Sequence, residues 1–156
     1  ERARWLLEMV GLADAAALYP YQLSGGMRRR VAFLSAIAPF PQVLLLDEPF
    51  SSLDEPTRVA IHQDVFDILR RLGIATVIVT HDLAEAASLC DEVAIFSARP
   101  ARMAARQAIP FGAKREILSL RKEPEFLSVY AHLWDVLSRQ IMLGRAAVAS
   151  DAGAMP

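Results

Sequence analysis

Residues 43–50 read VLLLDEPF, an unbroken apolar run that leads directly into two carboxylates, Asp47 and Glu48. Such a run is typical of a strand buried on both faces, as in a parallel sheet. A second stretch, 75–80 (ATVIVT), is rich in β-branched residues, which favour strands, and it ends directly before His81. Because ligands of open α/β sheets lie beyond the carboxyl ends of the strands, we expect Asp47, Glu48 and His81 to converge there.

Helical patterns lie before and between these strands. Ser24 is a suitable N-cap for a helix that runs to about Ala38, and a second helix is predicted from Asp54 to its stop at Gly73. A third strand is predicted at 93–96. The order strand, helix, strand, helix, strand predicts an α/β fold with right-handed crossovers.

The pattern changes beyond residue 100. We expect an edge strand at 108–111 and a frayed tail at 144–156, which consists mostly of alanine and other small residues. Between them, Pro124 opens a strongly amphipathic helix that we expect to pack on its own domain, a partner-binding face being the alternative. Its apolar residues, at spacings of three and four, are Phe126, Val129, Tyr130, Leu133, Trp134, Leu137 and Ile141.

The composition excludes several classes of protein. With 54% hydrophobic and 22% charged residues the chain is globular, and its 17 basic and 18 acidic residues favour neither nucleic acid nor anionic lipid. Cys90 is the only cysteine, so no intrachain disulfide is possible, and we expect its thiol to be buried and inert. No stretch approaches the roughly 20 apolar residues of a spanning helix, and no signal peptide is evident. We therefore expect a cytoplasmic protein.

The adjacent carboxylates after a buried strand suit a nucleotide triphosphatase. One carboxylate of this kind can hold Mg²⁺ through its waters, and the other can orient and deprotonate the attacking water. A histidine at the neighbouring strand end can donate a hydrogen bond to the terminal phosphate. Each feature alone is also common at strand–loop junctions, so only their combination and order support this function.

Residues 23–27 (LSGGM) supply a second candidate site. Ser24 caps a helix whose first two residues are glycines, so the amide groups at its N-terminus are unshielded and favour an anion such as phosphate. Three arginines follow at 28–30, where the positive end of the helix dipole makes cations unfavourable. We expect them to have an anionic neighbour or an acidic protein surface, a solvated basic patch being the alternative.

These segments together resemble a known family. Residues 19–28 (YPYQLSGGMR) resemble the signature motif of ATP-binding-cassette (ABC) ATPases, and 44–49 (LLLDEP) resemble their Walker B strand and catalytic glutamate. Residues 51–54 (SSLD) resemble the D-loop, and 80–82 (THD) the switch-histidine segment. The resemblance implies the C-terminal part of a P-loop-type cassette, with a parallel sheet flanked by helices and part of the helical subdomain.

The resemblance also implies roles for individual residues. Asp47 would support Mg²⁺, Glu48 would act on the hydrolytic water, and His81 would contact the γ-phosphate of ATP. The signature residues that would contact ATP held by a second subunit are Leu23, Ser24, Gly25, Gly26 and Met27. The D-loop residues that would communicate across the dimer are Ser52, Leu53 and Asp54.

Further expectations concern partners and location. The resemblance implies an ATPase that pairs head-to-tail with a second copy and drives transmembrane permease subunits, which receive solute from a periplasmic binding protein. Such a subunit is peripheral on the cytoplasmic face of the membrane. Residues 97–102 (SARPAR), with the segments around 124–126 and 133–134, are similar to importers of the nitrate, sulfonate and taurine group. The transported solute contacts other subunits and is not readable from this chain.

On this resemblance the chain divides into segments. Residues 1–40 would end the helical subdomain, 41–100 would hold the Walker B, D-loop and histidine core, and 101–143 would be a C-terminal extension. Two positions depart from the family pattern: Ser35 stands where arginine is usual, and Arg29 where glutamine is usual.

The 156 residues contain no Gly-x-x-x-x-Gly-Lys-Ser/Thr pattern, whose amides and lysine cradle nucleotide phosphates. We therefore expect a fragment of a longer ATPase. Alone, this fragment should bind ATP poorly and be inactive as an enzyme, and it should expose an apolar sheet edge and face. Two alternatives remain open. One is a natural half-cassette that lends its signature residues to an intact partner, and the other is a cytosolic ABC protein of DNA repair or translation.

Overall fold

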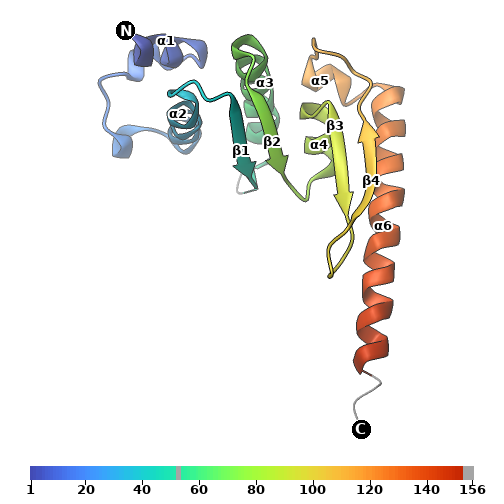
Figure 1. Ribbon diagram of the computed structural model, residues 1–156. Helices are drawn as coiled ribbons and strands as arrows, with labels where there is room; N and C mark the ends of the chain where they lie inside the picture. Colours follow the sequence, from blue (N-terminus) through green and yellow to red (C-terminus); the bar gives the residue numbers. More distant parts are fainter. Residues whose placement is uncertain (52–53, 153–156) are drawn as a thin grey trace. The chain divides into compact units, whose positions relative to one another are not determined.

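The computed structural model describes residues 1–51 and 54–152, and the chain divides into two compact units (Figure 1). Unit 1 is Glu1–Thr80 and unit 2 is His81–Pro156. The division falls at the end of the second strand, whereas the sequence analysis placed a change at residue 100. Each unit is an arrangement of helices on a two-stranded sheet.

Unit 1 begins with helices. These are α1 (Arg2–Met9), the 3₁₀ turns η1 (Ala13–Ala15) and η2 (Pro20–Gln22), and α2 (Gly25–Ile37). The side chain of Ser24 accepts a hydrogen bond from the Met27 amide at 3.2 Å, which confirms Ser24 as the N-cap of α2. Leu34 and Ile37 of α2 are buried, so this helix packs through its C-terminal half.

The sheet of unit 1 consists of β1 (Val43–Asp47) and β2 (Ala75–Val79), joined by α3 (Glu55–Leu72). The two strands are parallel, with Val43 opposite Ala75 and Asp47 opposite Val79. The helix α3 begins and ends as expected: the Asp54 side chain accepts from the Thr57 amide, and Gly73 stops the helix at a φ of 63°. The predicted parallel strand–helix–strand unit is therefore confirmed.

Only one face of this sheet is buried. Figure 1 shows α3 behind the two strands, and Leu44 is 7% exposed whereas its neighbour Leu45 is 73% exposed. Val77 and Val79 of β2 are exposed in the same way. The prediction that residues 43–46 are buried on both faces is wrong for the described chain, because a helix layer covers one side only. The expectation of an exposed apolar sheet face is confirmed.

The described part of unit 2 contains three helices and a hairpin that is formed by two strands. Its elements are α4 (Leu83–Leu89), β3 (Glu92–Phe96), β4 (Met103–Ala108), α5 (Ile117–Leu120) and α6 (Pro124–Ala152). The third predicted strand, β3, does not extend a parallel sheet but pairs antiparallel with β4, because their connection is too short for a parallel return. The edge strand expected at 108–111 lies earlier, as β4. Ile109 directly after it turns into the core.

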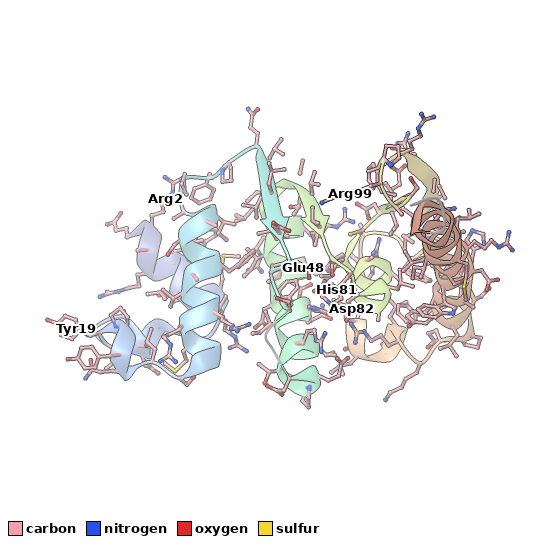
Figure 2. The ribbon with its side chains drawn as sticks, turned by 90° about the horizontal axis from the view of Figure 1, so that it is seen from below. Arg2, Tyr19, Glu48, His81, Asp82 and Arg99 are labelled. Carbon is pink, nitrogen blue, oxygen red and sulfur yellow. The ribbon has the colours of Figure 1, made fainter. Side chains whose placement is uncertain are left out.

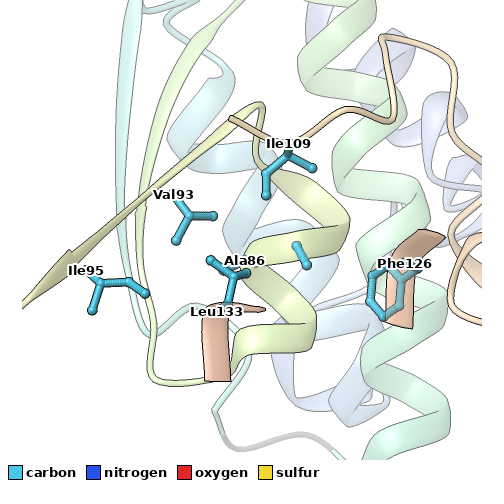
Figure 3. Packing of buried hydrophobic residues seen from close by; sticks show 7 residues of the cluster. Ala86, Val93, Ile95, Ile109, Phe126 and Leu133 are labelled. Carbon is cyan, nitrogen blue, oxygen red and sulfur yellow. The ribbon is translucent and has the colours of Figure 1, made fainter. Parts of the chain in front are cut away.

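The core of unit 2 lies between α4, the β3–β4 hairpin and the first half of α6 (Figure 3). Its buried residues are Ala86, Ala87, Val93, Ile95, Ile109, Phe126 and Leu133. Val129 and Leu137 pack against this cluster, so one face of the amphipathic helix packs on its own unit, as expected. Tyr130, Trp134 and Ile141 of the same pattern are exposed and do not belong to the core.

The helix α6 is longer than expected. It continues to Ala152 and so includes most of the segment that was expected to fray, while residues 153–156 lie outside the described part. Gly144 of this helix approaches the loop after β3 so closely that an added Cβ would lie 2.7 Å from the Cβ of Ala98. Among the described residues, no helix is both long and apolar enough to cross a lipid bilayer.

The guanidinium of Arg115 joins the segment after β4 to the end of α4. It is almost fully buried and donates to the carbonyl oxygens of Ser88 at 3.1 Å, Cys90 at 2.7 Å and Gly112 at 2.7 Å, and to the Asp91 carboxylate at 2.8 Å. A cation is favourable at the C-terminus of a helix, where carbonyl groups lack partners. Arg115 therefore stabilises the junction between α4 and β3.

We predict that Arg115→Met lowers the free energy of unfolding of the chain by about 2–3 kcal/mol, because several buried acceptors lose a charged donor. Urea unfolding followed by circular dichroism measures this change. Arg106→Met is the matched control, since Arg106 also pairs with a carboxylate, that of Glu92, but on the surface. The control should change stability little. Equal effects of the two substitutions would contradict the role assigned to Arg115.

We also predict that Cys90 reacts slowly with iodoacetamide in the folded chain. Burial raises the pKa of the Cys90 thiol to about 11 from the ordinary 9.0, which lowers its thiolate fraction near neutral pH about 100-fold. Alkylation should accelerate as the pH rises toward 11, and the chain should lose stability over the same range, because only the unfolded state readily forms the thiolate. Equal alkylation rates of folded and urea-unfolded chain at pH 8 would contradict this prediction.

Candidate functional site

Asp47 and Glu48 lie at the carboxyl end of β1. Asp47 is exposed and pairs in the ladder with Val79, the last residue of β2. The Glu48 amide then donates to the Val79 carbonyl oxygen at 2.8 Å, so the backbone of Glu48 is fixed to β2 by one further hydrogen bond. Figure 2 shows Glu48 at this end of the sheet. The structure thus places both carboxylates where the sequence analysis expected them.

The turn after Glu48 has features that the sequence did not indicate. Glu48 has a φ of 46°, which is uncommon for a residue with a Cβ. Its carbonyl oxygen accepts from the Ser51 hydroxyl at 3.1 Å and from the Ser51 amide at 3.4 Å. Phe50, between them, is buried and meets the ring of the buried His62 of α3 edge-on, with 4.6 Å between centroids. The turn is therefore anchored both to β2 and to α3.

Asp47 is suited to hold a divalent cation. In residues 1–51 and 54–152 no group of three or more His, Cys, Asp or Glu residues is placed to enclose a metal ion. A single exposed carboxylate fits Mg²⁺, because this ion keeps several waters and in nucleotide sites takes further oxygens from phosphates. The residues present therefore fit Mg²⁺ bound together with a nucleotide.

The D-loop segment is described only in part. Ser52 and Leu53 lie outside the described residues, so the roles predicted for them stay predictions. The carboxylate of Asp54 accepts from the Thr57 hydroxyl at 3.0 Å and from the Thr57 amide at 3.2 Å. These two hydrogen bonds lower the pKa of Asp54. Asp54 thus has a local role as the N-cap of α3, and its predicted role across a dimer is untested.

His81 and Asp82 open unit 2. His81 is exposed, and Asp82 caps α4 by accepting from the amides of Ala84 at 2.8 Å and Glu85 at 3.1 Å. Asp82 thereby fixes the start of the helix that directly follows His81. Since His81 belongs to a different unit from Asp47 and Glu48, its convergence with them stays a prediction.

The signature segment presents an open helix N-terminus. Leu23 is buried and Ser24 caps the helix, so the segment is anchored at its first residues. A Cβ added to Gly25 or Gly26 would meet no atom within 4 Å. The packing of this chain therefore does not require glycine at either position. The absence of side chains instead leaves the amides at the start of α2 accessible to an anion or to another molecule.

The arginines after the signature have specific partners. Arg28 donates to the Leu23 carbonyl oxygen at 2.6 Å, and Arg30 pairs with the Asp64 carboxylate at 3.1 Å and donates to the Val10 carbonyl oxygen at 3.2 Å. The expected anionic neighbour is thus confirmed for Arg30, and α3 supplies it. Ser35, where the family usually has arginine, donates to the Val31 carbonyl oxygen of its own helix.

Tyr19 and Tyr21, at the start of the segment that resembles the signature motif, form an exposed aromatic pair that the sequence did not indicate. Their rings stack with 5.7 Å between centroids, and they are 65% and 80% exposed. Figure 2 shows Tyr19 and Glu48 on opposite sides of α2.

Comparisons with known proteins agree with these features. Residues 1–51 match the protein family described as "ABC transporter". The chain is 38% identical over 138 residues to the uncharacterized ABC transporter ATP-binding protein YtlC of Bacillus subtilis, covering 85% of this chain and 52% of YtlC. It is 37% identical over 131 residues to the nitrate import ATP-binding protein NrtD of Synechocystis, covering 81% of this chain and 49% of NrtD.

A solved structure shares the fold. It is CbiO1 of Clostridium perfringens, part of the ABC transporter complex CbiONQ, with a TM-score of 0.61 and 27% identity over 86% of this chain and 52% of CbiO1. The chain spans about half the length of the curated relatives named above. The carboxylates after β1, the capped glycines of α2 and these relatives together assign the chain to the ATP-binding proteins of the ABC transporter family.

Proposed function

We propose that this chain is part of the ATP-hydrolysing subunit of a bacterial ABC importer. The observation that carries this proposal is the position of Glu48, which directly follows Asp47 at the end of β1 and has its amide bonded to β2. A general base must be held within hydrogen-bonding reach of the water that it activates. A carboxylate on the rigid end of a sheet meets this requirement better than one on a free loop.

In this proposal each residue has a distinct role. Glu48 accepts the proton of the water that attacks the γ-phosphate, and His81 donates a hydrogen bond to that phosphate. Asp47 would hold Mg²⁺, which when bound neutralises charge on the phosphate oxygens. Since Asp47 and Glu48 are adjacent, a single strand end positions both the ligand of the cation and the base.

The signature residues would act on a nucleotide held by a second copy of the subunit. Ser24, Gly25 and Gly26 present an open helix N-terminus, which favours a phosphate group. Two copies that pair head-to-tail about a twofold axis would bring this segment of one copy to Glu48 of the other. Each of the two sites would then combine the base of one copy with the signature of the other.

The proposal for the transported solute and for the other transporter subunits rests on similarity to known importers. NrtD is a nitrate import protein by name, and the similarity of segments 97–102 and 124–126 to that group supports uptake of nitrate, a sulfonate, taurine or a related solute. Such a subunit would dock on transmembrane permease subunits at the cytoplasmic face of the membrane. The solute would reach the permease from a periplasmic binding protein, without contact to this chain.

Nucleotide binding also requires a phosphate-binding loop, whose Gly-x-x-x-x-Gly-Lys-Ser/Thr pattern is absent from residues 1–156. We propose that the active ATPase contains this loop in addition to the present sequence. The test is the DNA sequence upstream of the codon for Glu1. An in-frame strand and loop pattern would support the proposal, whereas an immediate start codon would favour a half-cassette that completes the site of an intact partner.

In the ATPase that contains this sequence and the phosphate-binding loop, we predict that Glu48→Gln abolishes nearly all hydrolysis, about 10²-fold or more, because the base is lost. ATP-driven dimerisation should persist, since glutamine keeps the shape of the side chain. Phosphate release and analytical ultracentrifugation measure the two properties. Hydrolysis close to the wild-type rate would contradict the assignment of Glu48.

For the same ATPase we predict that Gly25→Asp prevents ATP-driven dimerisation, because it places a carboxylate against the γ-phosphate bound by the partner. Folding should be unaffected, since a Cβ at Gly25 meets no atom within 4 Å and an acidic residue suits a helix N-terminus. Ala32→Asp, an exposed position in the middle of α2, is the matched control and should dimerise normally. Dimerisation of both variants would refute the proposed role of the signature segment.

A further inference from the structure

The backbone of Glu48 has an unusual conformation. Its φ of 46° lies in the left-handed region, which disfavours a residue with a Cβ. Glycine adopts such angles without this cost, and asparagine and aspartate adopt them more often than glutamate does. The sequence therefore has a glutamate at a position where the backbone favours other residues.

Three neighbouring contacts hold this conformation. On the N-terminal side, the Glu48 amide donates to the Val79 carbonyl oxygen of β2 at 2.8 Å. On the C-terminal side, the Glu48 carbonyl oxygen accepts from Ser51, from its hydroxyl at 3.1 Å and from its amide at the longer distance of 3.4 Å. The ring contact between Phe50 and His62 fixes the chain between these two points. A strained residue persists when its surroundings determine its conformation in this way.

The contacts differ in kind. The amide bond to β2 continues a strand ladder, and the Phe50 contact is ordinary core packing, so both also serve the fold. The Ser51 side chain is exposed, and within residues 1–51 and 54–152 its hydroxyl donates to the carbonyl oxygen of Glu48 alone. Its side chain therefore acts directly on the peptide group that follows Glu48.

We propose that Ser51 is a positioning residue, whose hydroxyl holds the strained backbone of Glu48 and thereby orients the Glu48 carboxylate toward the attacking water. This inference rests on the proposed function of Glu48 as the general base. Without this hydrogen bond the φ of Glu48 could relax out of the left-handed region, and a change in φ would redirect the Cα–Cβ bond. A displacement of about 1 Å at a catalytic group can lower the rate about 10²-fold.

The strain itself is tested in the present chain, without nucleotide. At an ordinary strand position a protein with glycine is less stable than the same protein with alanine, but at a left-handed φ the order reverses. We expect Glu48→Gly to have a folded-to-unfolded ratio about 5- to 30-fold higher than Glu48→Ala in urea unfolding. A lower ratio for Glu48→Gly than for Glu48→Ala would overturn the inference that this backbone is strained.

The positioning role is tested in the ATPase that contains the phosphate-binding loop. We expect Ser51→Ala to lower kcat about 10-fold or more with little change in the KM for ATP, and Ser51→Thr, which keeps the hydroxyl, to restore it. Ser138→Ala is the matched control, because the Ser138 hydroxyl also donates to a carbonyl oxygen three residues earlier, at 3.1 Å, on the surface of α6. This control should leave kcat unchanged.

A double-mutant cycle separates this inference from the proposed function. If Ser51 acts through Glu48, Ser51→Ala should have no further effect on kcat in the Glu48→Gln variant. An unchanged kcat in Ser51→Ala, or additive effects of the two substitutions, would overturn the positioning role. Failure of Glu48→Gln alone to reduce kcat would instead refute the proposed function, whatever the result for Ser51.

Discussion

The parallel ladder between β1 and β2 determines where the reactive carboxylates of unit 1 lie. It pairs Asp47 with Val79, and the next amide along the chain, that of Glu48, continues the same set of hydrogen bonds. Parallel strands cannot be joined by a tight turn, so α3 has to lie between them and pack on the sheet. The register of five residue pairs thus fixes both the position of the carboxylates and the place of the helix that supports the following turn.

Much of this arrangement can be predicted from local sequence. Asp54 and Gly73 mark the ends of α3, and Ser24 marks the start of α2, because capping depends on residues only three or four positions away. The carboxylates after β1 are also found where the apolar run predicts them. Strand partners are harder to infer, since a run such as 93–96 does not specify its neighbour, and its pairing with β4 followed from a short connection rather than from its own residues.

The contacts that sequence reasoning missed join distant residues or depend on a backbone angle. Arg115 reaches carbonyl oxygens about two dozen positions earlier, and no periodicity links such residues. The φ of Glu48 is not visible in the letters DEPFS, because glutamate is not a residue that indicates a left-handed backbone. The prediction that β1 is buried on both faces failed for a physical reason. An apolar run shows that burial is favourable, but it does not show whether the described chain has helices to cover both faces of the sheet.

The close approach of Gly144 to Ala98 limits how α6 can move. Phe126 and Leu133 fix the first half of this helix in the core, and the contact at Gly144 fixes a point farther along it. Sliding or rolling the helix would bring a residue with a Cβ toward Ala98, where even a Cβ added at Gly144 would lie only 2.7 Å from the Ala98 Cβ. The helix therefore packs both on the core of unit 2 and on the connection between β3 and β4.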